Sequence, residues 1–160
     1  MHIAKVMQES LQDGKGCNLV VVCQGCSIHC PGCHNQELWP SDGGYNIKPE
    51  DVLSYLTPVT TGLTVSGGEP TDQPIELRAL LHLAKAIGIK TTLYTGHEFD
   101  ELRAVPLIAD ILDGTDYIKC GPFVEELRDT TSGLYGSTNQ KLYEVHKLTN
   151  GYHCIEEVKS

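Results

Sequence analysis

The chain has no long hydrophobic run. Its longest purely aliphatic stretch, Leu19 to Val22, is far too short to cross a bilayer, and no apolar signal segment stands at the N-terminus. Clusters of basic residues are also absent: 12 Lys and Arg stand against 21 Asp and Glu, for a net charge of −9. This scarcity of cations disfavours nonspecific nucleic-acid binding, which depends on neutralising phosphates. We therefore expect a cytoplasmic protein that binds neither membranes nor nucleic acid.

The length and the cysteine content bound the architecture. A chain of 160 residues can bury a core of its own without disulfides. We find no internal repeat, low-complexity tract or linker, so residues 1–160 are predicted to form a single domain. The seven cysteines are odd in number and three of them gather in one short loop, which favours a reducing compartment over a disulfide scaffold.

Strand and helix patterns alternate about every ~25–30 residues, the spacing of βαβ units. The continuous run Cys17 to Cys23 is typical of a strand buried on both faces in a parallel sheet. Because a full eight-unit barrel needs on the order of 250 residues, the predicted fold is α/β, an open partial (β/α) barrel with a mostly parallel sheet. Strands are expected at 2–7, 17–23, 61–66, 89–94 and 116–120, and a hairpin at 142–148 and 152–158. Helical segments are expected at 49–56 and 73–87, and two more, divided at Pro106, within 98–112.

The helix expected before Gly88 carries two specific predictions. Asp72 can cap its N-terminus. A stripe at helical spacing predicts which of its side chains are buried; the stripe consists of Ile75, Leu80, Ala84 and Ile87.

Cys26, Cys30 and Cys33 lie in a short loop directly after an apolar strand, with the spacing C-x3-C-x2-C. A tetrahedral zinc site normally closes with four Cys or His ligands. Three thiolates suit a cubane iron–sulfur cluster, because they leave one iron with an open position for a ligand from outside the protein. A zinc site completed by His29, His34 or Cys23 is the alternative.

Gly67-Gly68-Glu69-Pro70 follows the next strong strand pattern. Alone, a Gly-Gly turn is a common connection between a strand and a helix. Paired glycines, however, let backbone N–H groups approach a small ligand closely, and a carboxylate such as that of Glu69 suits an ammonium group. Ligands bind at the C-terminal ends of parallel strands, so we expect this turn and the cysteine loop to face the same site.

The two motifs together resemble those of the radical S-adenosylmethionine (SAM) enzymes. In that family the three cysteines hold a [4Fe–4S] cluster, SAM chelates the open iron, and the Gly-Gly-Glu-Pro turn holds the amino group of SAM. The resemblance implies Cys26, Cys30 and Cys33 as metal ligands. It implies Gly67, Gly68, Glu69 and Pro70 as residues that bind the cofactor SAM.

Further segments are similar to the small glycyl-radical activases, above all the family that activates anaerobic ribonucleoside-triphosphate reductase. This resemblance implies that Thr95, Gly96, His34 and Asn35 also contact the cofactors. The chain departs from the pattern at Asn18, where that family often has Arg. The matching segments are Asp13–Gly16, Val22–Cys26, Cys30–Asn35, Leu38–Trp39, Tyr94–Gly96, Asp116–Phe123 and Gly136–Gln140.

The implied activity is that of a radical SAM oxidoreductase. The reduced cluster passes one electron into the sulfonium of SAM, and the resulting carbon radical takes a hydrogen atom from a glycine in the large reductase subunit. No catalytic side chain is implied beyond the cluster and SAM, and the sequence has no convincing hydrolytic triad. An electron donor such as flavodoxin or ferredoxin is the second implied partner.

Three alternatives stay open: activation of another glycyl-radical enzyme, a radical SAM enzyme that acts on a small molecule, and a zinc-binding interaction module. The cysteines outside the motif are expected to be inert, because free Cys in a strand behaves as a small hydrophobe. Cys120 and the hairpin at 141–158 have no assigned role.

Overall fold

The computed structural model describes residues 1–129, 131 and 136–158. Within these residues the chain forms one eight-stranded sheet with the strand order β3-β1-β2-β4-β5-β6-β7-β8. The strands are β1 (His2–Ser10), β2 (Asn18–Cys23), β3 (Tyr45–Asn46), β4 (Gly62–Gly67), β5 (Lys90–Tyr94), β6 (Tyr117–Cys120), β7 (Lys141–Lys147) and β8 (His153–Glu157).

The sheet is mixed rather than mostly parallel. The pairs β2–β4, β4–β5 and β5–β6 are parallel, whereas β1–β2, β1–β3, β6–β7 and β7–β8 are antiparallel. The prediction of a mostly parallel sheet is therefore correct for its centre and wrong for the sheet as a whole, whereas the hairpin expected at 142–148 and 152–158 is confirmed as the pair β7–β8. The connections explain two of the antiparallel pairs, β1–β2 and β7–β8, because the short segments 11–17 and 148–152 can join only antiparallel neighbours, whereas parallel neighbours need a long crossover.

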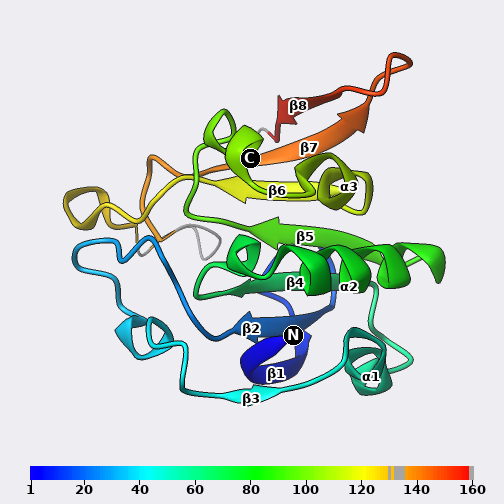
Figure 1. Ribbon diagram of the computed structural model, residues 1–160, viewed down its shortest axis with the longest axis horizontal. Coiled ribbons are helices and arrows are strands. Elements are labelled where there is room, and N and C mark those ends of the chain that lie inside the picture. The colour runs from blue at the N-terminus through cyan, green and yellow to red at the C-terminus, as the bar shows by residue number, and fades with distance from the viewer. Residues whose placement is uncertain (130, 132–135, 159–160) are drawn as a thin grey trace.

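In the part of the chain that the structure describes, three helices and five 3-10 turns connect the strands. In Figure 1, α2 and α3 lie in front of the sheet. No helix in the described part of the chain is long and apolar enough to span a membrane. The helices are α1 (Pro49–Val52), α2 (Pro74–Ala86) and α3 (Ile108–Asp113); the turns are η1 (Gln36–Leu38), η2 (Leu53–Tyr55), η3 (Pro70–Asp72), η4 (Glu101–Ala104) and η5 (Glu125–Leu127).

The hydrophobic core lies between the helices and one face of the sheet. Helix α2 buries Leu80 and Ala84 as predicted, but Ile75 and Ile87 are 68% and 56% exposed. Leu77 and Leu81 complete the buried stripe in their place, since the 77, 80, 81, 84 positions share one helix face. The sheet contributes alternate residues to this core, among them Leu19, Val21, Leu63, Val65, Leu93 and Ile118.

The opposite face of the sheet is polar at β4, β5 and β6, whereas Val20 and Val22 of β2 form a small second apolar cluster there with Leu38. Because side chains alternate along a strand, Thr64, Thr92 and Tyr117 point away from the helical core. The segment 11–17 folds across this face: the Thr64 hydroxyl donates to the Asp13 carbonyl at 2.6 Å, and Asn18 Nδ2 donates to two carbonyls of the same segment, at 3.2 and 3.0 Å. The segment covers the base of the polar face and leaves the part nearer the strand ends open.

Candidate functional site

A cavity of about 520 Å³ lies on the polar face, at the C-terminal ends of the parallel strands. The arrowheads of these strands all point to the left in Figure 1, where the blue loop after β2 and the yellow segment after β6 converge. The residues that line the cavity include Asp13, Cys26, Ile28, Cys30, Cys33, His34, Asn35, Ser66, Gly67, Gly68, Glu69, Tyr94, Thr95, Gly96, Lys119, Phe123 and Arg128.

The cysteine loop leaves the end of β2 and is closed at its neck. Gly25, with a φ of +92°, turns the chain, and the Gly25 N–H donates to the Leu38 carbonyl at 2.8 Å. A second turn stands between the last two cysteines, where the Cys33 N–H donates to the Cys30 carbonyl at 3.1 Å. Gly32 has a φ of +72° there, which suits the second central position of a type II turn after proline. These two turns bring Cys26, Cys30 and Cys33 to one cavity.

Two side-chain contacts fasten this loop to the rest of the molecule. Asp72 accepts hydrogen bonds from both the backbone N–H and the hydroxyl of Ser27, each at 2.8 Å. The rings of His29 and Trp39 stack with their centroids 4.7 Å apart. The prediction that Asp72 caps the following helix is wrong: the N-cap residue of α2 is Gln73, without a side-chain cap, and Asp72 anchors the cysteine loop.

The environments of the thiols differ. Burial raises the pKa of Cys26, while hydrogen bonds from the backbone of His29 and Ile28 act in the opposite direction by stabilising the thiolate. The Asn35 N–H lies 3.5 Å from Cys33 Sγ and donates to it. For Cys26 the effect of burial is the larger of the two, so the pKa of its thiol is raised.

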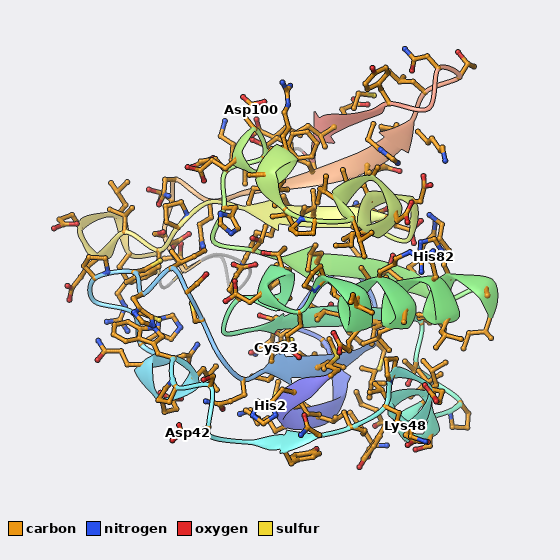
Figure 2. The ribbon with its side chains drawn as sticks, viewed as in Figure 1. His2, Cys23, Asp42, Lys48, His82 and Asp100 are labelled. Atoms are coloured by element: carbon orange, nitrogen blue, oxygen red, sulfur yellow. The ribbon has the colours of Figure 1, made fainter. Side chains whose placement is uncertain are left out.

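Two cysteines outside the motif lie in the core. Cys23, labelled in Figure 2, ends β2 and is buried. Burial first, and the Glu69 charge second, raise the pKa of Cys23 to about 12. Burial likewise raises the pKa of Cys120 to about 12. Both are therefore protonated thiols near neutral pH.

The donor set fits an iron–sulfur cluster. All seven cysteines are free thiols, and three of them line one cavity. Among residues 1–129, 131 and 136–158, no three Cys, His, Asp or Glu side chains gather as ligands of one ion would. A four-iron cluster makes a different demand, because each thiolate binds a different iron. Cys26, Cys30 and Cys33 are the residues that would hold it.

The paired glycines allow the ends of β2 and β4 to pack closely. The Gly68 N–H donates to the Cys23 carbonyl and the Glu69 N–H to the Gly25 carbonyl, both at 2.9 Å. A Cβ atom on Gly68 would stand 2.0 Å from the Gly25 carbonyl oxygen. The N–H groups of Gly68 and Glu69 thus bind the root of the cysteine loop instead of facing the cavity, while Gly67 and Gly68 line it.

The Glu69 carboxylate is buried and joins the ends of β4 and β5. Its Oε1 accepts from the Thr71 N–H at 3.0 Å and from two hydroxyls, Thr71 at 2.7 Å and Thr95 at 2.9 Å. Its Oε2 accepts from the Gly96 N–H at 2.9 Å. Oε1 thus accepts from three donors and Oε2 from one. Within the described residues Oε2 is therefore the less occupied oxygen, and the one at which a further donor such as an ammonium group would bind.

The other residues expected at the site take different positions. Thr95 and Gly96 line the cavity and hold Glu69. His34 and Asn35 also line it, and the His34 ring meets Phe123 edge-on at 5.4 Å. Pro70 is buried and begins η3, so it stands behind the cavity wall.

Lys119 is a cavity residue that the sequence analysis did not identify. Its Nζ lies 3.8 Å from the centroid of the Tyr94 ring. Burial lowers the pKa of Lys119 from 10.5 to about 8, and the Asp13 charge offsets part of this effect. The alternation of Tyr117 and Lys119 with Ile118 and Cys120 was the available signal, because it places the lysine on the polar side of a strand end.

Comparisons with known proteins agree with this chemistry. Residues 12–143 match the family model described as 4Fe-4S single cluster domain. The chain is 36% identical over 101 residues to the pyruvate formate-lyase-activating enzyme of Clostridium pasteurianum, across 59% of this chain and 42% of that enzyme. It is 26% identical over 144 residues to the anaerobic ribonucleoside-triphosphate reductase-activating protein of Escherichia coli (strain K12), across 83% and 92%.

A third relative is the pyruvate formate-lyase 1-activating enzyme of Escherichia coli (strain K12), 29% identical over 143 residues. That alignment covers 84% of this chain and 56% of the relative. The chain thus spans about half the length of the pyruvate formate-lyase-activating relatives it matches.

Proposed function

This chain belongs to the radical SAM family of 4Fe-4S single cluster domains and is homologous to glycyl-radical activases, and from that premise we propose that it generates a glycyl radical on anaerobic ribonucleoside-triphosphate reductase. One observation carries the proposal: the three motif cysteines and the Glu69 network border the same cavity. We further propose that residues 1–160 act as a single domain, and that the sheet curves as an open partial barrel around this cavity.

We assign Cys26, Cys30 and Cys33 the role of holding a [4Fe–4S] cluster with one iron open. When the cluster and SAM are bound, they supply a one-electron reductive cleavage of the sulfonium and a carbon radical that removes a hydrogen atom from a glycine of the partner. An electron donor such as flavodoxin or ferredoxin would provide the electron.

The chain's own residues position and shield these groups. Oε2 of Glu69 would accept from the amino group of SAM, and Thr95 and Gly96 hold the carboxylate in place for that contact. His34 and Asn35 border the same space. A carboxylate held by several protein donors costs no reorganisation when its ligand arrives, which is the benefit of a preorganised site.

The choice of the reductase rests on the extent of the resemblance. The alignment with the reductase-activating protein takes in 92% of that protein. The alignments with the pyruvate formate-lyase-activating enzymes take in 42% and 56% of theirs. Pyruvate formate-lyase is the second candidate partner, because identity reaches 36% with the clostridial enzyme.

The test is an activation assay under anaerobic conditions. The protein is reconstituted with iron and sulfide, mixed with SAM, dithionite and either purified reductase or pyruvate formate-lyase, and examined by electron paramagnetic resonance. We expect a glycyl-radical signal with the reductase and a weaker one or none with pyruvate formate-lyase. The reverse preference would move the assignment to the second partner, and no signal with either would reject the activase function.

A matched pair of cysteine variants controls this assay. Cys30→Ser removes one motif thiol and should abolish both the cluster and the signal. Cys154→Ser removes an exposed thiol on β8 and should change neither. Stoichiometric zinc without iron in anaerobically purified protein would favour the zinc-binding module instead.

A further inference from the structure

We propose that Lys119 is a positioning residue that donates a hydrogen bond to a backbone carbonyl oxygen of the polypeptide segment carrying the target glycine. This inference rests on the proposed function, because it requires a protein substrate that enters the cavity. Lys119 lies at the deep end of the cavity, below the cysteine loop and Glu69.

The strand register fixes that depth. Tyr94 and Lys119 are partners in the parallel pair β5–β6, and Ser66 precedes the end of β4 by one residue. All three line the cavity from the sheet. The cysteine loop and Glu69 lie beyond the strand ends, so a ligand that contacts both sits above this row. A group bound at Lys119 sits deeper, on the side toward the segment 11–17.

The polar groups at this deep end of the cavity suit a bound polypeptide backbone. A peptide segment that leaves water brings carbonyl groups that need donors. The Lys119 ammonium is a charged N–H donor, and its Nζ lies over the face of the Tyr94 ring on this wall, 3.8 Å from the ring centroid. Of the described lysines and arginines that line the cavity, Lys119 is the half-buried one, whereas Arg128 is exposed at the rim.

The surroundings of Lys119 also favour a peptide carbonyl over a free carboxylate as its ligand. Asp13 lines the same cavity and its charge acts on Lys119. A carboxylate ligand would approach both groups and be repelled by Asp13. A neutral carbonyl can accept from the ammonium without that repulsion, while Asp13 can accept from a peptide N–H.

The experiment measures binding and chemistry separately. Lys119→Met keeps much of the length and removes the donors, Lys119→Arg keeps a cationic donor, and Lys5→Met removes an exposed lysine of β1 as a matched control. For each protein we would measure iron content, SAM cleavage by dithionite without a partner, and the Kd for whichever glycyl-radical enzyme the wild type activates.

We expect Lys119→Met to keep its cluster and its partner-independent SAM cleavage, and to bind the partner roughly 10- to 100-fold more weakly, as the loss of a charge-assisted hydrogen bond implies. Lys119→Arg should restore most of the affinity, and Lys5→Met should match the wild type.

Two results would overturn the inference. Wild-type affinity in Lys119→Met, with a working wild-type activase, would reject the role of Lys119 and leave the proposed function standing. Loss of SAM cleavage in that variant with its cluster intact would place Lys119 at the cofactor instead. Absence of any glycyl radical in the wild type would reject both proposals together.

Discussion

At the scale of single residues, the Glu69 carboxylate connects two strand ends and accepts hydrogen bonds from two N–H groups and two hydroxyls. Hydroxyls can rotate to accept instead of donate, but the backbone N–H groups of Thr71 and Gly96 cannot. An amide at this position must therefore direct its NH₂ group at one of these N–H donors.

We predict that Glu69→Gln lowers the free energy of unfolding by about 1–3 kcal/mol, the cost of leaving a buried donor without a partner. The measurement is urea denaturation of the cluster-free protein. Glu144→Gln, at an exposed position on β7, should leave the midpoint unchanged. Equal stability of Glu69→Gln and the wild type would mean that the network is not formed as described.

The lowered pKa of Lys119 predicts that the stability of the fold rises with pH. Its pKa in the folded protein is about 8, below its ordinary value of 10.5. Between these values the unfolded chain binds the proton and the folded chain does not, so stability rises with pH. Below pH 8 both states are charged and the desolvation cost is present in full.

We therefore expect the unfolding free energy of the wild type to gain on that of Lys119→Met as pH rises from about 8 to about 10.5. Denaturant titrations at several pH values across this window give the difference directly. A difference that is flat, or that falls with pH, would show that the ammonium is not desolvated in the fold.

At the scale of elements, the contact between the ends of β2 and β4 depends on the missing side chain of Gly68. A Cβ atom there would meet the Gly25 carbonyl oxygen at 2.0 Å and its carbon at 2.8 Å. Both are backbone atoms at the root of the cysteine loop, so they cannot move aside without moving that loop.

We predict that Gly68→Ala destabilises the fold by about 1–3 kcal/mol, the range for overpacked sites, and also lowers the iron that the protein takes up. Gly88→Ala is the control, because it has a φ of +81° but nothing within 4 Å; it should cost only the strain of about 1–2 kcal/mol for a left-handed residue and leave iron uptake unchanged. Normal iron uptake by Gly68→Ala would show that the cysteine loop does not need the close contact at Gly68 to bind iron.

The elements also show what the sequence could predict. The strand from 17 to 23 and the turn at 67–70 were identifiable because β-branched runs and glycine pairs act locally. The partners of a side chain depend on distant parts of the chain. Asp72 was assigned to a helix cap because it precedes α2, whereas it binds Ser27, 45 residues earlier. The sequence alone could not show whether Ile75 or Leu77 is buried, because this depends on which face of the helix packs against the sheet.

At the scale of the whole molecule, the two faces of the central sheet have separate tasks. The helices cover one face and bury the core, so the strands are held rigidly while their polar face borders the cavity. Folding stability and ligand contacts thus depend largely on different residues. The parallel centre of the sheet was predictable from the βα repeat, and the β7–β8 hairpin from its own local pattern. The antiparallel pairs β1–β3 and β6–β7 join strands that lie far apart in the sequence, and no local pattern predicts them.

The central claim is that three thiolates leave one iron for SAM to complete. The most direct measurement is electron–nuclear double resonance on the reduced cluster, with SAM labelled isotopically in its amino and carboxylate groups. We predict hyperfine coupling of both labels to the cluster in the wild type, and a weaker amino coupling in Glu69→Gln. A reconstituted cluster that binds SAM without coupling to either label would contradict the account.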